Sequence, residues 1–342
     1  MTLANLLTHP FVTYNDSIPW LLPLSGDLES VAQNIASVFS IIQHPDLYPP
    51  IEEVLIIHTP EIGNATIKTL LQFFHRESSS LRFQVISDRN AELVCFSSLG
   101  VIGQHRVTGE GGLFDSRFDS IMFKSHVYKY FGLTPSEGKR RSNSIVLYLT
   151  QLFKEDKKVL INSDAIGYIE RQLHGLIEVT RRDITSMNWK GLVKYMMSVD
   201  IVLAASGSHL LLSLFLMPKS GVVEIQPVNY RNYYYQRLSI QSDLYYQAHH
   251  NFTSAIPLPI ECDRFSEENG IDKRCKEAIL QQEVIIPPIT LWMYMVDMAN
   301  TVNHNKYHMY SFCVCNKKLS NTLQENIKPL ITHKRRMNKR KE

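Results

Sequence analysis

The chain has 342 residues, of which 44% are apolar and 10% aromatic, which is enough for two ordinary domains or one large α/β unit. Its formal charge of +3 is nearly neutral for this length, and much of the excess lies in the last ten residues. Without that basic run the body is roughly neutral, so nucleic acid is not an implied partner of the fold.

Signals for the cellular compartment point in two directions. The N-terminus lacks a basic region followed by an apolar stretch, and no run of about 18 apolar residues occurs, so neither a signal segment nor a membrane span is predicted. Three Asn-x-Ser/Thr sequons, at Asn15, Asn64 and Asn251, slightly favour a secretory route. Cys262 and Cys275 flank a charged loop and would be bridged in an oxidising compartment, although free thiols agree with the sequence equally well.

Residues 1–135 are expected to form an N-terminal α/β half, because apolar runs of strand length alternate with apolar residues at helical spacing. The predicted elements are helices at 28–42, 67–75 and 119–131 and strands at 51–58, 81–86 and 91–96.

A glycine-rich, charged stretch at 103–118 interrupts this half and is expected to be a loop beyond a strand end, where functional residues concentrate. Its ionisable side chains His105, Glu110 and Asp115 are candidates for a catalytic general base. A solvated surface loop without a catalytic role is an equally good interpretation.

Residues 136–143 combine glycine, serine and charge and are predicted to be an exposed linker. A second Rossmann-like half is expected at 144–260. A C-terminal segment at 261–312 contains an apolar helix at 289–302 that is expected to cross back onto the first half, and 313–342 is expected to be a basic, disordered tail. The predicted elements of the second half are strands at 144–149, 176–180, 201–205 and 222–225 and helices at 163–173, 188–197, 208–216 and 233–240.

The turn at Ser206, Gly207 and Ser208 is the centre of this second half, because it joins an apolar strand to an apolar helix in a βαβ unit. A glycine turn at a helix N-terminus offers backbone N–H groups and the positive end of the helix dipole to a phosphate. Many such turns bind no ligand, so the turn alone is a weak signal.

Three motifs in the expected order resemble glycosyltransferase family 61, over about residues 90–300. The turn AASGSHL at 204–210, followed by LFL and VEI, resembles the nucleotide-binding signature of that family. The run KVLIN at 158–162 resembles its R-x-I-x-N segment, and VCF followed by VIG at 94–103 resembles a stretch ahead of its acceptor-side loop.

The resemblance, strongest to the animal-type branch, implies a GT-B-like fold of two Rossmann-like halves that face a cleft. It also implies inverting transfer of a sugar, N-acetylglucosamine above all, from a UDP-sugar to a hydroxyl of a glycoprotein. Neither a metal nor a cofactor is implied, and the compartment would be the lumen of the endoplasmic reticulum or Golgi.

The donor-binding residues that follow from the motif positions are Lys158, Asn162, Ser206, Gly207, Ser208, His209 and Glu224. Gly207 would admit the diphosphate or simply form a tight turn, and the two serines would bind phosphate or cap the helix. His209 would point at the site or pack inward. Glu224 would accept from ribose hydroxyls, and Asn162 would cap a helix, donate to phosphate, or do both.

The chain departs from the family at its expected diphosphate ligands. Ser206 stands where the family has a histidine, no arginine occurs in 147–153 after the first strand, and Lys158 replaces a second arginine. Lysine provides a point charge where arginine provides a bidentate fork. A divergent transferase and a non-catalytic binding protein derived from the same fold are both compatible with these changes. A cytosolic nucleotide-dependent enzyme of another kind is a third hypothesis.

Overall fold

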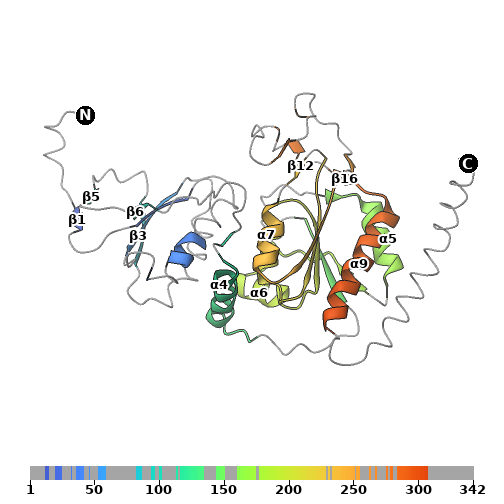
Figure 1. The fold of residues 1–342 in the computed structure, drawn as a ribbon, viewed down its shortest axis with the longest axis horizontal. Helices are drawn as coiled ribbons and strands as arrows, with labels where there is room; N and C mark the ends of the chain where they lie inside the picture. Colours follow the sequence, from blue (N-terminus) through green and yellow to red (C-terminus); the bar gives the residue numbers. More distant parts are fainter. Residues whose placement is uncertain are drawn as a thin grey trace, which may run out of the picture.

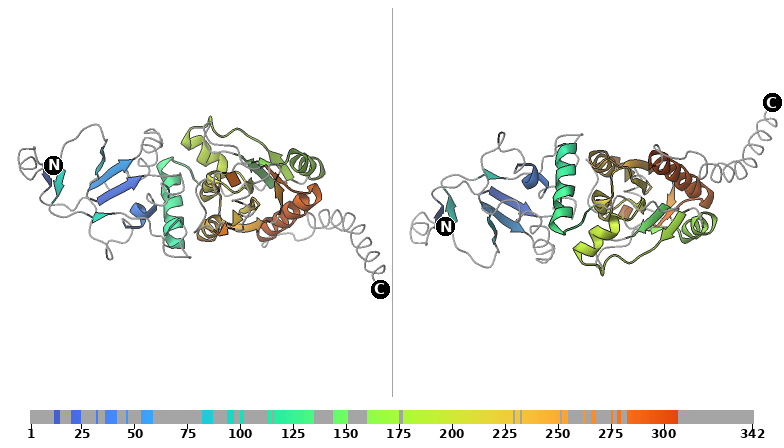
Figure 2. Two further views of the ribbon diagram at one scale, coloured as in Figure 1. Left: turned by 90° about the horizontal axis from the view of Figure 1, so that it is seen from above. Right: turned by 90° about the horizontal axis from the view of Figure 1, so that it is seen from below.

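A computed structural model gives the three-dimensional structure of the protein (Figures 1 and 2). It describes residues 12–14, 20–24, 32, 36–41, 46, 53–58, 82–86, 94–96, 100–101, 113–114, 116–134, 144–150, 160–174, 177–228, 230–231, 233–250, 252–254, 262, 266–267, 275, 278–279 and 283–306. The α/β class is confirmed, with a parallel sheet in each half, which is the layout of a GT-B-like protein.

The first half contains a four-stranded parallel sheet in the order β4-β3-β2-β6, formed by Arg82–Ile86, Glu53–His58, Trp20–Leu24 and Gly100–Val101. A separate parallel pair joins β1 (Val12–Tyr14) to β5 (Val94–Phe96). The predicted strands at 51–58, 81–86 and 91–96 are confirmed to within a few residues, whereas β1, β2 and β6 were not predicted. The expected helix at 67–75 lies outside the described residues.

The second half is built on a five-stranded parallel sheet in the order β13-β11-β10-β7-β9. Its strands are β7 (Ser144–Leu149), β9 (Ile177–Thr180), β10 (Ile201–Ala205), β11 (Gly221–Ile225) and β13 (Tyr245–His249). In chain order this is the doubly wound arrangement 2-1-3-4-5, whose order reverses between β7 and β10.

Helices cover both faces of this sheet, which explains why its central strands are continuous apolar runs (Figure 1). One face packs against α5 (Ser163–Gln172) and α9 (Pro288–Lys306). The other face packs against α6 (Trp189–Met196), η1 (Ser208–Phe215) and α7 (Tyr234–Gln241). The predicted helices at 163–173, 188–197 and 233–240 are confirmed, and the helix after the glycine turn is a 3₁₀ helix.

Short strands complete the second half. They are β8 (Leu160–Ile161), β14 (Thr253–Ser254) and β16 (Glu283–Ile285), which form one small sheet, and β12 (Tyr230–Arg231) paired with β15 (Ser266–Glu267).

The long C-terminal helix α9 packs against α5 and against β11 of the second half, rather than onto the first-half sheet as expected from its sequence. Met298 and Val302 of α9 approach Gly221 so closely that a Cβ at that position would lie 2.5 Å from the Met298 Sδ atom. Among the described helices, none combines the length and apolarity needed to cross a membrane.

Helix α4 (Arg117–Tyr130) lies between the two sheets (Figure 2). Its Phe123 ring packs edge-on against Phe39, in the helical segment 36–41 of the first half. On the other side the buried Lys124 Nζ donates to the Leu216 and Ser242 carbonyl oxygens, at 2.9 and 3.1 Å. The helix expected at 119–131 is therefore confirmed. The helical spacing of its apolar residues predicts that Ile121 faces inward with Val127, but Ile121 is 40% exposed.

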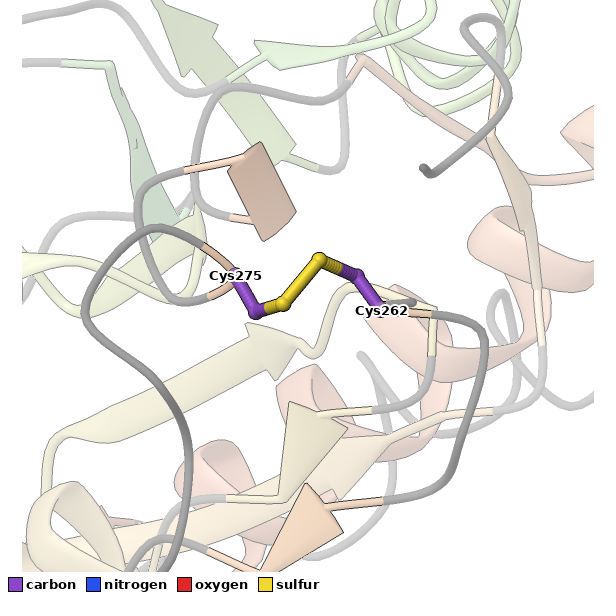
Figure 3. The surroundings of a disulfide bond; sticks show 2 residues. All are labelled: Cys262 and Cys275. Carbon is purple, nitrogen blue, oxygen red and sulfur yellow. A yellow bond between two sulfur atoms is a disulfide. The ribbon is translucent and has the colours of Figure 1, made fainter. Parts of the chain in front are cut away.

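A disulfide joins Cys262 to Cys275 (Figure 3), with the two Cα atoms 5.3 Å apart. Of the two alternatives for these cysteines, a disulfide or free thiols, the structure contains the disulfide. The bond closes the charged loop that includes β15.

Candidate functional site

The carboxyl ends of the five parallel strands meet at one edge of the second sheet, which is where ligands bind in open α/β folds. At the reversal of strand order, Thr150 follows β7 and Ser206 follows β10. Arg181 follows β9 at the same edge. We call this region the carboxyl edge.

The glycine turn lies at the carboxyl edge, as the βαβ pattern predicted. Ser206 and Gly207 are buried, and Ser208, the first residue of η1, is half-buried. The Gly207 backbone is extended, with a φ of 166°, so its conformation does not require glycine. The first N–H groups of η1 have no partner inside the helix, so this end of η1 provides donors for an anion.

Glu224 is fully buried near the end of β11, and its carboxylate accepts two hydroxyl hydrogen bonds. One comes from Ser206 in the turn and the other from Tyr246 on β13. Burial, and after it the Glu224 charge, raises the pKa of Tyr246, so the phenol stays protonated and donates. Both carboxylate oxygens are thus engaged by the protein, and contact with a ribose would require one hydroxyl to be displaced.

His209 is buried within η1, and its Nε2 atom lies 2.9 Å from the Ala205 carbonyl oxygen. Because a carbonyl oxygen only accepts, Nε2 carries the proton of the imidazole. Burial lowers the pKa of His209 to about 4, so the ring is neutral at pH 7. This position favours the inward-packing alternative, with the imidazole linking the start of η1 to the end of β10.

Asn162 is the N-cap residue of α5, but its side chain does not cap the helix. Its Oδ1 atom instead accepts from the Ile286 N–H at 2.9 Å, which ties the start of α5 to the end of β16. Lys158 and the three candidate bases, His105, Glu110 and Asp115, lie outside the described residues.

A pocket of about 350 Å³ opens at the carboxyl edge between the ends of β7 and β9, and the sequence analysis did not anticipate it. Its lining residues are Tyr148, Leu149, Thr150, Leu160, Arg181, Arg182, Asp183, Ile184 and Thr185. The volume lies in the range of small-molecule sites, and the lining combines apolar side chains with charged and hydroxyl groups. The signal that could have identified it is the Arg-Arg-Asp run directly after the predicted strand at 176–180.

Two arginines line this pocket in different electrostatic settings. The Arg181 guanidinium binds both Glu170 oxygens, at 2.6 and 2.8 Å. The Arg182 guanidinium lies over the Tyr195 ring, 4.8 Å from its centroid. The Asp183 carboxylate accepts from the backbone N–H and the hydroxyl of Thr185, at 2.9 and 2.7 Å.

Among the described residues, no group of three or more His, Cys, Asp or Glu side chains is placed to hold a metal ion.

Comparison with known proteins gives structural likenesses only. No family model matches the chain, and no curated protein matches it in sequence. Among solved structures, the chain is similar to the iron-containing dodecameric glycosyltransferase TibC from enterotoxigenic E. coli H10407, with a TM-score of 0.35 and 11% identity over 86% of this chain and 78% of that one. The same protein in complex with ADP-D-β-D-heptose gives a TM-score of 0.36 at the same identity and coverage.

The E. coli heptosyltransferase WaaC with ADP is also similar, with a TM-score of 0.29 and 9% identity over 68% of this chain and 91% of that one. TM-scores of this size transfer neither an activity nor residue roles to this chain.

Proposed function

We propose that the protein is a glycosyltransferase that binds a nucleotide-sugar donor at the carboxyl edge of its second sheet. The observation that carries this proposal is the position of the Ser206-Gly207-Ser208 turn, which opens a helix at the reversal point of a doubly wound sheet. A pocket large enough for part of a nucleotide lies at the same edge.

The motifs shared with glycosyltransferase family 61 lead us to propose a UDP-sugar as the donor and a glycoprotein hydroxyl as the acceptor. In the inverting reaction the acceptor oxygen attacks the anomeric carbon, the bond to the diphosphate breaks, and UDP leaves. A base takes the hydroxyl proton, and His105, Glu110 and Asp115 remain the candidates for it. Donors at the turn would stabilise the negative charge that develops on the leaving diphosphate.

The Cys262–Cys275 disulfide supports placing the protein in an oxidising compartment, because such bonds persist in secretory lumens and are rare in the cytosol. We therefore extend the proposal to the lumen of the endoplasmic reticulum or Golgi.

The proposal is tested by measuring UDP release from UDP-N-acetylglucosamine, UDP-glucose and UDP-xylose with the purified chain and a mixture of glycopeptide acceptors. We expect release with at least one donor, and loss of that activity in Gly207→Trp, where the indole would obstruct the turn. A Gly167→Ala variant, which is changed within α5 and away from the turn, serves as a folded control.

Retained binding of UDP without turnover of any donor would contradict the transferase assignment. It would favour the second candidate, a non-catalytic binding protein, which the altered cation positions after the first strand of this half support.

A further inference from the structure

The segment that follows the first strand of the second half offers no cation, because residues 147–153 contain no arginine or lysine. A diphosphate bound at the glycine turn would carry two or more negative charges close to a sheet edge. Backbone N–H groups alone supply partial charges there, so a full cation from elsewhere in the fold would complete the site.

Strand pairing brings two arginines to this place from the neighbouring strand. In the parallel register of β7 and β9, Leu147 lies opposite Thr180. The chain continues from Thr180 into Arg181 and Arg182, while β7 continues into Leu149 and Thr150, and all four line one pocket. The second strand of the sheet therefore provides positive charge beside the end of the first.

Only one of these arginines has its full charge available. The Arg181 guanidinium is already bound by both oxygens of Glu170. Arg182, by contrast, forms no ion pair with any described carboxylate, and its Cζ atom lies over the Tyr195 ring, 4.8 Å from the ring centroid. A contact with the ring face does not consume the N–H groups of a guanidinium, which can therefore donate to an anion.

We propose that Arg182 is the phosphate-binding cation of the carboxyl edge and provides, from the end of β9, the positive charge that the segment after β7 lacks. Its ligand is a phosphate group of a nucleoside diphosphate, and Tyr195 orients the guanidinium. This inference rests on the proposed function, since it concerns the same donor.

The experiment measures the dissociation constants of UDP, of uridine and of inorganic pyrophosphate by calorimetry for the wild-type chain and for Arg182→Gln. The matched control is Arg171→Gln, which removes an exposed arginine from the last turn of α5. A charge-assisted hydrogen bond to phosphate predicts roughly tenfold to hundredfold weaker UDP binding in Arg182→Gln, with no change in the control. Uridine, which lacks phosphate, should bind both proteins with the same affinity.

The inference also predicts a weaker salt dependence in the variant, because the lost contact is electrostatic. Between about 50 and 500 mM NaCl, UDP affinity of the wild type should fall more steeply than that of Arg182→Gln.

Unchanged UDP affinity in Arg182→Gln, together with loss of binding in Gly207→Trp, would overturn the role of Arg182 and leave the proposed function standing. An equal loss of uridine and UDP binding in Arg182→Gln would also overturn it, because the pocket would then hold the nucleoside. If the wild type binds neither UDP nor pyrophosphate, the inference and the proposed function fail together.

Discussion

At the scale of single residues, the buried Glu224 carboxylate holds the glycine turn in place at the carboxyl edge through hydrogen bonds. A buried carboxylate is costly unless it is hydrogen-bonded, and the Ser206 and Tyr246 hydroxyls meet that need. Ser206 is part of the glycine turn, so the carboxylate connects that turn to β11 and, through Tyr246, to β13. The Ser206 hydroxyl is therefore used within the protein, as a donor to Glu224.

His209 gives a prediction for acid stability. Its folded-state pKa of about 4 lies below the ordinary value of 6.5, so between these pH values the unfolded chain binds more protons than the folded one. The contribution of His209 to the free energy of unfolding should therefore be complete above pH 6.5, and it should be lost as the pH falls toward 4. This one group should contribute at most about 3 kcal/mol to the loss.

The measurement is urea unfolding of the wild type and of His209→Gln at several pH values between 7 and 4. Glutamine does not titrate, so the variant should lose less stability than the wild type on acidification. Some pH dependence should remain in both proteins, because burial lowers the pKa of His249 to about 4 as well. Parallel curves for the two proteins would show that His209 is not the neutral, buried group described above.

At the scale of elements, the packing of α9 on the second sheet depends on a small residue in β11. A Cβ at Gly221 would lie 2.5 and 2.7 Å from the Sδ and Cγ atoms of Met298, and 3.1 Å from a methyl carbon of Val302. Both side chains are fully buried, so they cannot move out into solvent to make room for the Cβ.

Gly221→Ala is therefore expected to destabilise the protein by about 1–3 kcal/mol through overpacking. Gly167→Ala in α5 is the matched control, because its nearest neighbour is the end of the flexible Arg171 side chain, at 3.3 Å. Alanine in a helix interior should leave stability unchanged or raise it by up to about 1 kcal/mol. Denaturant midpoints provide the comparison, and equal stability of the two variants would mean that α9 does not press against Gly221.

The sequence predicted elements best where burial on both faces produces uninterrupted apolar runs, as at Ile201–Ala205 and Gly221–Ile225. It failed where tertiary contacts override local pattern. Ile121 is exposed because it lies on the same side of α4 as the exposed Ser125 and Lys129, whereas the buried side includes Lys124, whose ammonium group donates to two carbonyl oxygens. The helical period of apolar residues alone could not reveal that choice.

At the scale of the whole molecule, two parallel α/β halves were predictable because each contains β-α-β alternation. The order of strands was not, since pairing of β7 with β9 and β10 is decided by contacts distant in sequence. For that reason the turn at Ser206 was found from sequence, whereas the arginine-lined pocket was missed. Arg182 became a candidate only because the strand order places the end of β9 beside the end of β7.

The central claim is that the carboxyl edge of the second sheet binds a nucleoside diphosphate. The measurement that tests it most directly is a calorimetric titration of the folded wild-type chain with UDP, with uridine as reference. The account predicts saturable binding of one UDP per chain, tighter than that of uridine. A folded sample that shows no binding of UDP at millimolar concentration would contradict it.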